Sequence, residues 1–277
     1  MEPKLQRRIQ RYGWDKAADF YEQYWQQQLQ PAQTRLLEMA GLQRGEAVLE
    51  VACGTGLITF PAAAQVGAEG KVVATDISEQ MVELGRARAV ERGFSHISWL
   101  RRDAEDLQLP ETGFDAALCG LGMMYFPDPL QALREMKSAL KSGGRAVAAV
   151  WGKRAHCGWA EIFPIVDARV QSEVCPLFFQ LGTGDLLKQT FLAAGFEEVV
   201  LERIATLLHY DSSEDACGAA FIGGPVALAH ARFDERTRQE AYAEYLDSIA
   251  GYRNGNGYNI PGEFVIVRGR TPFGVNA

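Results

Sequence analysis

The sequence is poor in the residues and segments that mark several broad classes of protein. Its 277 residues include only four histidines and five cysteines. The cysteines are scattered, odd in number and without a C-x-x-C pair, so we expect free thiols and a cytoplasmic protein. No apolar run approaches the roughly 18 residues that a membrane-spanning helix needs, so we expect no membrane insertion.

Positive charge is also scarce. The chain carries 28 Lys and Arg against 35 Asp and Glu, a formal net charge of −7. A surface that binds nucleic acid needs an excess of basic residues, so we expect no nucleic-acid partner. The first eight residues are followed by no apolar stretch, so we expect no secretory signal. With 47% hydrophobic and 23% charged residues, the composition is that of an ordinary globular protein.

The most informative feature present is an apolar strand that ends in a glycine-rich turn. The strand is expected at about 47–52, and Gly54 and Gly56 follow it directly. Glycine lets the backbone approach a ligand closely, because a Cβ would collide with it. Asp76 lies 20 residues after Gly56, at the end of a second apolar strand, where its carboxylate can accept hydrogen bonds from both ribose hydroxyls. This spacing predicts an adenosine-containing cofactor.

Beyond this unit, apolar and polar segments alternate in a way typical of strands followed by helices. Residues 5–40 are expected to be helical, with Pro31 beginning a second helix. Further strands are expected at about 96–102, 115–119, 145–151, 197–206 and 264–268. The alternation predicts an α/β fold with a mainly parallel sheet and helices on both faces.

Four ordered segments resemble the motifs of class I S-adenosylmethionine-dependent methyltransferases. They cover residues 49–56, 76–81, 103–107 and 114–119. The resemblance is to the small-molecule branch that includes quinone-biosynthesis and natural-product methyltransferases, and it is strongest over about 45–150. It implies a Rossmann-like, seven-stranded sheet of order 3-2-1-4-5-7-6 with the last strand antiparallel. S-adenosylmethionine would lie across the carboxyl ends of strands one and four.

The resemblance also implies which residues would contact this cofactor. Gly54 and Gly56 would flank its methionine portion, and Asp76 would hold the ribose. Asp103 would accept the adenine amino group beside Ala104. The full expected set, in which Met81 could equally be a core residue, is Glu50, Ala52, Gly54, Gly56, Asp76, Ile77, Met81, Asp103, Ala104, Cys119 and Gly120.

The family's reaction is an SN2 methyl transfer, in which alignment of the reactants supplies much of the acceleration. A base is needed only if the acceptor must lose a proton. His156 follows strand five and His209 follows strand six, both at the cofactor edge of the sheet, so both are candidate bases. The candidate acceptor contacts are Tyr21, Tyr125, His156 and Tyr210. No metal is expected.

We expect one domain over 1–277, with 1–40 as a helical lid and 152–182 and 211–260 as a roof over the acceptor. Trp14, Tyr21 and Trp25 lie on one face of the expected N-terminal helix. This face could pack against the core, or it could close over the cofactor as part of the lid. An apolar or aromatic small-molecule acceptor is favoured by the aromatic residues of the roof, which are Trp159, Phe163, Phe178, Phe179, Phe221 and Tyr258.

Four other interpretations stay open. A nicotinamide dehydrogenase would carry Gly or Ala where this chain has Thr59. A nucleic-acid or protein methyltransferase is a second alternative. Enzymes of this kind that methylate the exocyclic amines of bases carry an acidic residue or Asn, two prolines and an aromatic residue after strand four, where this chain has Cys-Gly-Leu-Gly at 119–122. An arsenite methyltransferase would use several cysteines, for which Cys157, Cys175 and Cys217 are available. A protein of this fold that binds the cofactor without transferring methyl also fits. The motifs encode neither the acceptor atom nor the oligomeric state.

Overall fold

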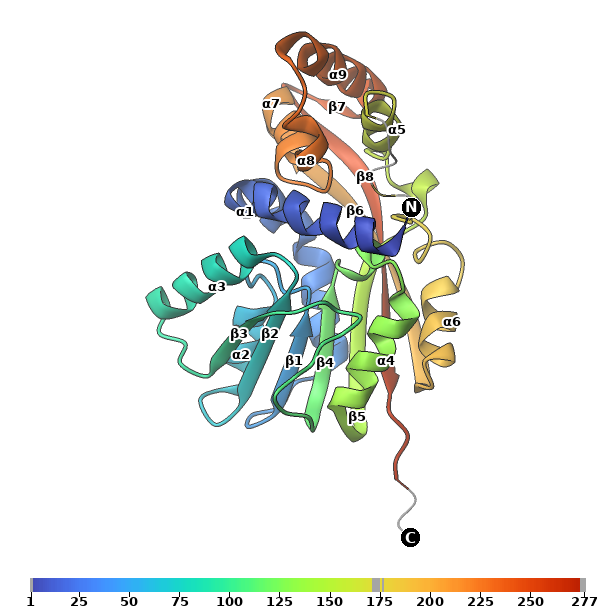
Figure 1. The fold of residues 1–277 in the computed structure, drawn as a ribbon. Helices are drawn as coiled ribbons and strands as arrows, with labels where there is room; N and C mark the ends of the chain where they lie inside the picture. Colours follow the sequence, from blue (N-terminus) through green and yellow to red (C-terminus); the bar gives the residue numbers. More distant parts are fainter. Residues whose placement is uncertain (1, 171–174, 176, 275–277) are drawn as a thin grey trace.

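The central element of the computed structural model, which describes residues 2–170, 175 and 177–274, is one sheet (Figure 1). Its strands run in the order β3-β2-β1-β4-β5-β8-β6, with the two-residue β7 paired to β8. The strands are β1 (Ala47–Val51), β2 (Lys71–Asp76), β3 (Ile97–Arg101), β4 (Phe114–Gly120), β5 (Leu140–Trp151), β6 (Glu197–Tyr210), β7 (Arg253–Asn254) and β8 (Gly257–Arg270). The strands β1 to β5 pair in parallel, and β8 is antiparallel to β5 and β6. The predicted fold and strand order are confirmed, and β7 is an addition to them.

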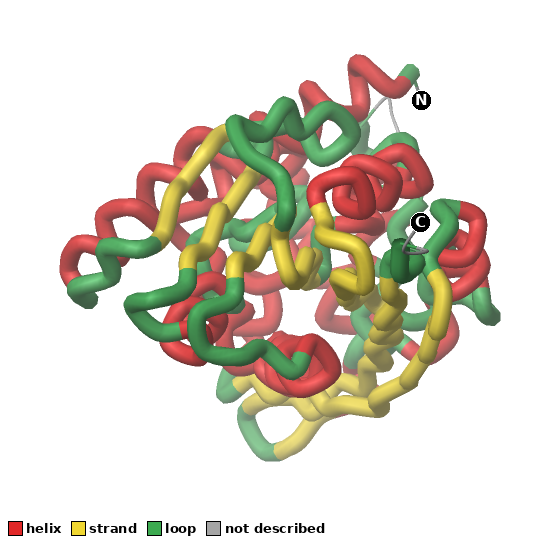
Figure 2. The backbone as a smooth tube through the Cα atoms, turned by 90° about the horizontal axis from the view of Figure 1, so that it is seen from below, coloured by secondary structure: helices red, strands yellow, loops and turns green. Residues whose placement is uncertain are grey.

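Helices cover both faces of this sheet, as the view from below shows (Figure 2). The longer ones are α1 (Pro3–Ala40), α2 (Thr59–Val66), α3 (Glu79–Glu91), α4 (Pro129–Ala139), α6 (Leu186–Ala193) and α9 (Glu235–Ser248). Shorter ones are α5 (Ile162–Asp167), α7 (Ser213–Cys217), α8 (Ala227–His230), and the single turns η1 (Met123–Tyr125), η2 (Arg154–His156), η3 (Gly218–Ile222) and η4 (Ala250–Tyr252). The N-terminal part of α1 crosses above the carboxyl ends of the strands, and α5 and α7–α9 lie beyond it (Figure 1).

Local sequence explains where several helices begin. The Ser78 side chain accepts a hydrogen bond from the backbone N–H of Met81 and so caps α3, as its position predicts. Asp128 caps α4 in the same way, and Pro129 occupies the first helical position, where no N–H is needed. Both caps follow strands of the parallel sheet. They therefore help to fix where the loops at its carboxyl edge end.

The prediction that Pro31 begins a second helix is wrong. Helix α1 continues through Pro31 as a single helix of 38 residues. An internal proline costs one backbone hydrogen bond. Residues on both sides of it, including Leu29, Ala32 and Leu36, are buried, and α1 packs along β4, β5, β6 and β8. This continuous packing offsets the missing hydrogen bond.

Three strands are also longer than the sequence predicts. Strand β5 begins at Leu140 rather than 145, and β6 and β8 pair from Glu197 and Arg270 out to Tyr210 and Tyr258. This β6–β8 ribbon rises past the end of the parallel strands toward α7–α9 (Figure 1). Along this extension the two strands pair with each other, so their backbone N–H and C=O groups are hydrogen-bonded. The residue pattern of either strand alone does not predict how far this pairing extends. Residues near the end of β6 are therefore carried beyond the edge of the parallel sheet.

No helix within the described residues has the length and apolar character required to cross a bilayer.

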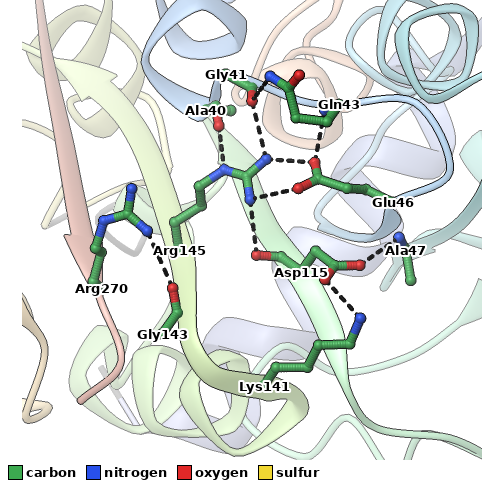
Figure 3. A network of polar contacts seen from close by, with 10 residues as sticks. All are labelled: Ala40, Gly41, Gln43, Glu46, Ala47, Asp115, Lys141, Gly143, Arg145 and Arg270. Atoms are coloured by element: carbon green, nitrogen blue, oxygen red, sulfur yellow. Dashed lines mark hydrogen bonds and ion pairs between the residues drawn. The ribbon is translucent and has the colours of Figure 1, made fainter. Parts of the chain in front are cut away.

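The opposite, amino-terminal edge of the sheet is held by a cluster of polar contacts around Arg145 (Figure 3). The Arg145 guanidinium donates to the carbonyl oxygens of Ala40, Gly41 and Asp115. It also makes a two-pronged pair with Glu46, at 2.5 and 3.0 Å. The Arg145 side chain is 11% exposed and that of Glu46 is 18% exposed. One side chain thus joins the end of α1 to the α1–β1 turn and to β4.

Replacing Arg145 with methionine should lower the free energy of unfolding by about 3 kcal/mol, because the Glu46 carboxylate and the helix-end carbonyls would lose their shared donor. Urea denaturation measures this change. The matched control is Arg236→Met on α9, which removes an exposed pair with Glu240 and should leave the midpoint unchanged. Equal losses in the two variants would contradict the role given to Arg145.

Candidate functional site

A cavity opens at the edge where β1, β2 and β4 end, beneath α1. It measures about 730 Å³, counting the space open to solvent, and we call it the first cavity. Predicted cofactor residues that line it are Ala52, Gly54, Asp76, Ile77, Met81, Asp103, Ala104 and Gly120. Helix α1 contributes Arg7, Gln10, Trp14 and Tyr21 to the opposite wall. The carboxyl ends of the parallel strands therefore gather most of the predicted set in one place.

The floor of the first cavity is held by the Asp76 carboxylate. One of its oxygens accepts from the backbone N–H of Gly54 and the other from that of Ser78, both at 2.9 Å. Asp76 is 8% exposed, and burial raises the pKa of its carboxyl to about 6 despite these hydrogen bonds. Each oxygen has a further lone pair for a ligand, because a carboxylate can accept about four hydrogen bonds.

The backbone is strained at two positions of this cavity. Ala52 and Leu121 both line it and both have positive φ angles, 57° and 61°. Residues with a Cβ rarely adopt this conformation, which concentrates at ligand sites. Each residue directly follows one of the two neighbouring strands, Ala52 after β1 and Leu121 after β4. The strain turns the chain sharply at the point where the two loops diverge.

Three predicted cofactor residues do not line the cavity. Glu50 lies beneath the turn, 1% exposed, and accepts a hydrogen bond from the Thr59 hydroxyl at 2.5 Å. Burial raises the pKa of Glu50 to about 8. Cys119 is fully buried, and burial raises the pKa of its thiol to about 12. Gly56 has a φ of 100°, and a Cβ there would lie 2.7 Å from Phe60, so packing also requires glycine.

Ionic and polar contacts tie α1 across the first cavity. Arg7 pairs with Asp103 at 3.0 Å and also with Glu105. Farther along the helix, Asp15 accepts from the Ser78 hydroxyl at 2.6 Å, and Glu22 accepts from Thr55 at 2.6 Å. Sequence reasoning did not find Arg7 and Gln10. Their only signal is the helical spacing that places them on the face of Trp14 and Tyr21.

A second cavity of about 350 Å³ adjoins the first, and aromatic side chains dominate it. Its lining residues are Trp14, Tyr21, Trp25, Leu29, Leu121, Met124, Tyr125, Trp151, Trp159, Phe178, Gly224 and Pro225. The two cavities share Trp14, Tyr21, Leu121 and Tyr125. The Trp14 ring meets that of Tyr125 edge-on at 5.2 Å between centroids. These shared residues mark the junction where a ligand in one cavity would face a ligand in the other.

The predicted roof residues take different places. Trp159 and Phe178 line the second cavity, whereas Phe163 packs behind them, 4.7 Å from Phe178 between centroids. Phe179 packs in the same layer, 5.6 Å from Trp159. Phe221 and Tyr258 are fully buried and line neither cavity among the residues described. Residues 171–174 and 176 of the predicted roof lie outside the described residues.

The candidate bases and one candidate acceptor contact lie elsewhere. His156 is 47% exposed and pairs with Glu263 at 2.9 Å. His209 is 49% exposed. Its hydrogen bond with Asn259 raises its pKa most, and its contact with Asp211 raises it further. Tyr210 is buried. In the described structure none of these three lines either cavity, and for His209 and Tyr210 the reason is the extended β6–β8 ribbon.

Buried Glu50 makes the stability of the ligand-free protein depend on pH. Its pKa is about 8 in the folded protein against 4.5 for an unperturbed glutamate, so stability present below about pH 4.5 is lost as the pH rises through 8. The Glu50→Gln variant should match the wild type near pH 4.5 and be more stable by about 1–3 kcal/mol at pH 8.5. Urea denaturation at several pH values measures this, with exposed Glu91→Gln as the control. A constant difference across the pH range would contradict the assignment.

Comparisons with known proteins agree with this geometry. A model of the ubiE/COQ5 methyltransferase family matches residues 25–163. The demethylmenaquinone methyltransferase of Listeria monocytogenes is 32% identical over 127 residues, which cover 46% of this chain and 54% of that protein. The aklanonic acid methyltransferase DauC of a Streptomyces species is 34% identical over 133 residues, 48% of this chain and 60% of that protein. The chain thus spans about half the length of the curated relatives it matches.

Solved structures share the fold. A candidate methyltransferase from Bacillus halodurans superimposes with a TM-score of 0.61 at 21% identity, over 87% of this chain and 99% of the other. The [4+2]-cyclase SpnF superimposes with a TM-score of 0.56 at 21% identity, over 88% and 82%. At such identities the likeness concerns the fold alone. The family match, in contrast, covers half of the chain and contains the loops after β1, β2, β3 and β4. The chain belongs to the ubiE/COQ5 methyltransferase family.

Proposed function

We propose that this protein transfers a methyl group from S-adenosylmethionine to a small acceptor that is apolar or aromatic. The observation that carries the proposal is the pair of adjoining cavities. The first presents carboxylates and backbone turns from the ends of β1, β2 and β3, and the second is walled by aromatic side chains. Membership of the ubiE/COQ5 family supports the same reaction.

The residues of the first cavity fit this cofactor. The free lone pairs of Asp76 suit a ribose diol, because each oxygen already has one backbone donor and retains one acceptor site. Asp103 and Ala104 would contact the adenine, and the turn at Gly54 would lie beside the methionine portion. When bound, S-adenosylmethionine supplies a methyl group on a positively charged sulfur. Buried Asp76 gives this cavity a negative group that favours such a charge.

The second cavity fits the acceptor. Its enclosure by aromatic and aliphatic side chains suits a small apolar molecule and not a macromolecule. Aromatic walls exclude water and can hold a planar ring against the junction between the cavities. There Tyr21 and Tyr125 would help to align the acceptor with the methyl carbon, which is the main requirement of an SN2 transfer.

The surrounding segments fit the roles of lid and roof within one domain. Helix α1 walls both cavities and is tied across the first by Arg7. The roof segment 152–182 contributes Trp159 and Phe178 to the second cavity, and the segment 211–260 contributes Pro225. The five cysteines are free thiols, and the cytoplasm remains our predicted compartment.

Incubation with labelled S-adenosylmethionine and a panel of phenols, quinols, amines and thiols tests the proposal. Labelled product is expected from the aromatic members of the panel. Tight binding of S-adenosylmethionine with no transfer to any acceptor would favour a cofactor-binding protein of the same fold. Failure to bind it would reject the proposal outright.

The Asp76→Ala variant should bind S-adenosylmethionine at least about tenfold more weakly, because the ribose hydroxyls lose a charged hydrogen-bond acceptor. Isothermal titration measures the affinity, and circular dichroism confirms that the variant is folded. The control is Asp247→Ala, at an exposed position on α9 away from the cavities, which should bind as the wild type does. Unchanged affinity in a folded Asp76→Ala protein would refute the ribose assignment.

A further inference from the structure

Two buried indole N–H groups of the second cavity have no hydrogen-bond partner. The Nε1 atoms of Trp25 and Trp159 are both enclosed and unpaired in the described structure. Their side chains are deeply buried, with only 7% of Trp25 and 5% of Trp159 exposed. Indole N–H can donate a hydrogen bond but cannot accept one. A buried donor without a partner is costly, so each such group calls for an explanation.

The position of these indoles points to a ligand. Trp25 and Trp159 both line the second cavity, with ring centroids 6.2 Å apart. The Nε1 of Trp25 lies 3.7 Å from where a Cβ on residue 224 would stand, and Gly224 lines the same cavity. The Trp25 N–H therefore lies next to the part of the cavity wall that Gly224 contributes.

The other polar side-chain groups of this cavity are also donors at neutral pH. Tyr21 and Tyr125 line it, and burial raises the pKa of both phenols well above the usual range, so both keep their protons. The remaining lining residues are aliphatic or aromatic or glycine, and no Asp, Glu, His, Lys or Arg is among them in the described structure. The cavity thus offers N–H and O–H donors and no carboxylate or imidazole that could take a proton.

We infer that the acceptor enters the second cavity as an oxyanion, a small planar phenolate or enolate, and that Trp25 and Trp159 donate hydrogen bonds to its oxygens. This inference rests on the proposed function, because it concerns the acceptor of that reaction. Hydrogen bonds to an ionised acceptor are the strong ones, and they are stronger in a site that excludes water.

The chemistry balances without a base. An electron pair of the acceptor forms the new bond to the methyl carbon, and the electrons of the breaking carbon–sulfur bond remain on sulfur. The anion and the sulfonium both become neutral, and no proton leaves in this step. Coulomb attraction to the sulfonium favours an anion beside it and offsets the repulsion from the Asp76 carboxylate, whose charge also acts on Tyr21. The acceptor's own acidity therefore replaces a protein base.

Binding of a matched pair of probes tests this inference. The protein is saturated with S-adenosylhomocysteine and titrated calorimetrically at pH 7.5. The probes are 2-hydroxy-1,4-naphthoquinone, which is anionic at this pH, and 2-methoxy-1,4-naphthoquinone, a neutral compound of similar shape. The anion should bind at least about tenfold more tightly than the ether. Trp25→Phe and Trp159→Phe, which keep an aromatic ring, should each weaken anion binding about three- to tenfold and leave ether binding unchanged.

The control variant is Trp99→Phe. Trp99 also carries a buried, unpaired indole N–H, but it packs against Phe60 outside the second cavity, so both affinities should stay as in the wild type. Equal or tighter binding of the ether would overturn the inference. So would equal losses for both probes in the two cavity variants, or no binding of either probe to protein that holds S-adenosylhomocysteine. Failure to bind S-adenosylhomocysteine itself would instead count against the proposed function.

Discussion

One carboxylate joins the two loops on which the first cavity depends. Asp76 ends β2, yet its oxygens accept backbone N–H groups from the turn after β1 and from the start of α3. The loops after the neighbouring parallel strands β1 and β2 are thereby held in fixed positions relative to each other. The arrangement requires a buried charge, which raises the pKa of Asp76 toward neutrality. Glu50 lies buried beneath the same turn with a raised pKa, so the cavity floor and the turn below it each contain an acid that is costly to ionise.

Helix α1 completes what the sheet begins. The sheet alone would leave the ends of β1, β2 and β4 open to water. Arg7, Asp15 and Glu22 fasten the helix to loops from three strands, so polar contacts hold it over an otherwise apolar junction. Between these contacts, Trp14 and Tyr21 face inward and divide the enclosed space into a polar and an aromatic part. Two chemically different binding environments thus meet at a shared wall.

The resemblance of four motifs to the methyltransferase family implied the strand order. The residues themselves predicted a mainly parallel sheet and much of the first cavity, because glycine turns and strand-end carboxylates are local signals that such a sheet brings to one edge. The sequence did not predict the uninterrupted α1, since tertiary packing on both sides of Pro31 outweighs the local tendency of proline to break a helix. Nor did it separate Trp159, which walls the second cavity, from Phe221, which is buried elsewhere. Their spacing carries no sign of this difference. His156 and His209 follow strands as expected, but neither lines a cavity in the described structure. For His209 the cause is the length of the β6–β8 ribbon, which comes from the pairing of two distant segments.

Helix α1 also joins the two edges of the sheet. The carbonyl of Ala40 at its C-terminal end is held by Arg145 at the amino-terminal edge, and its first turns close the opposite side. Because Trp14 and Tyr21 belong to both walls, the position of this helix sets the size of both cavities together. One helix is therefore fastened at both edges of the sheet and closes both cavities between these contacts.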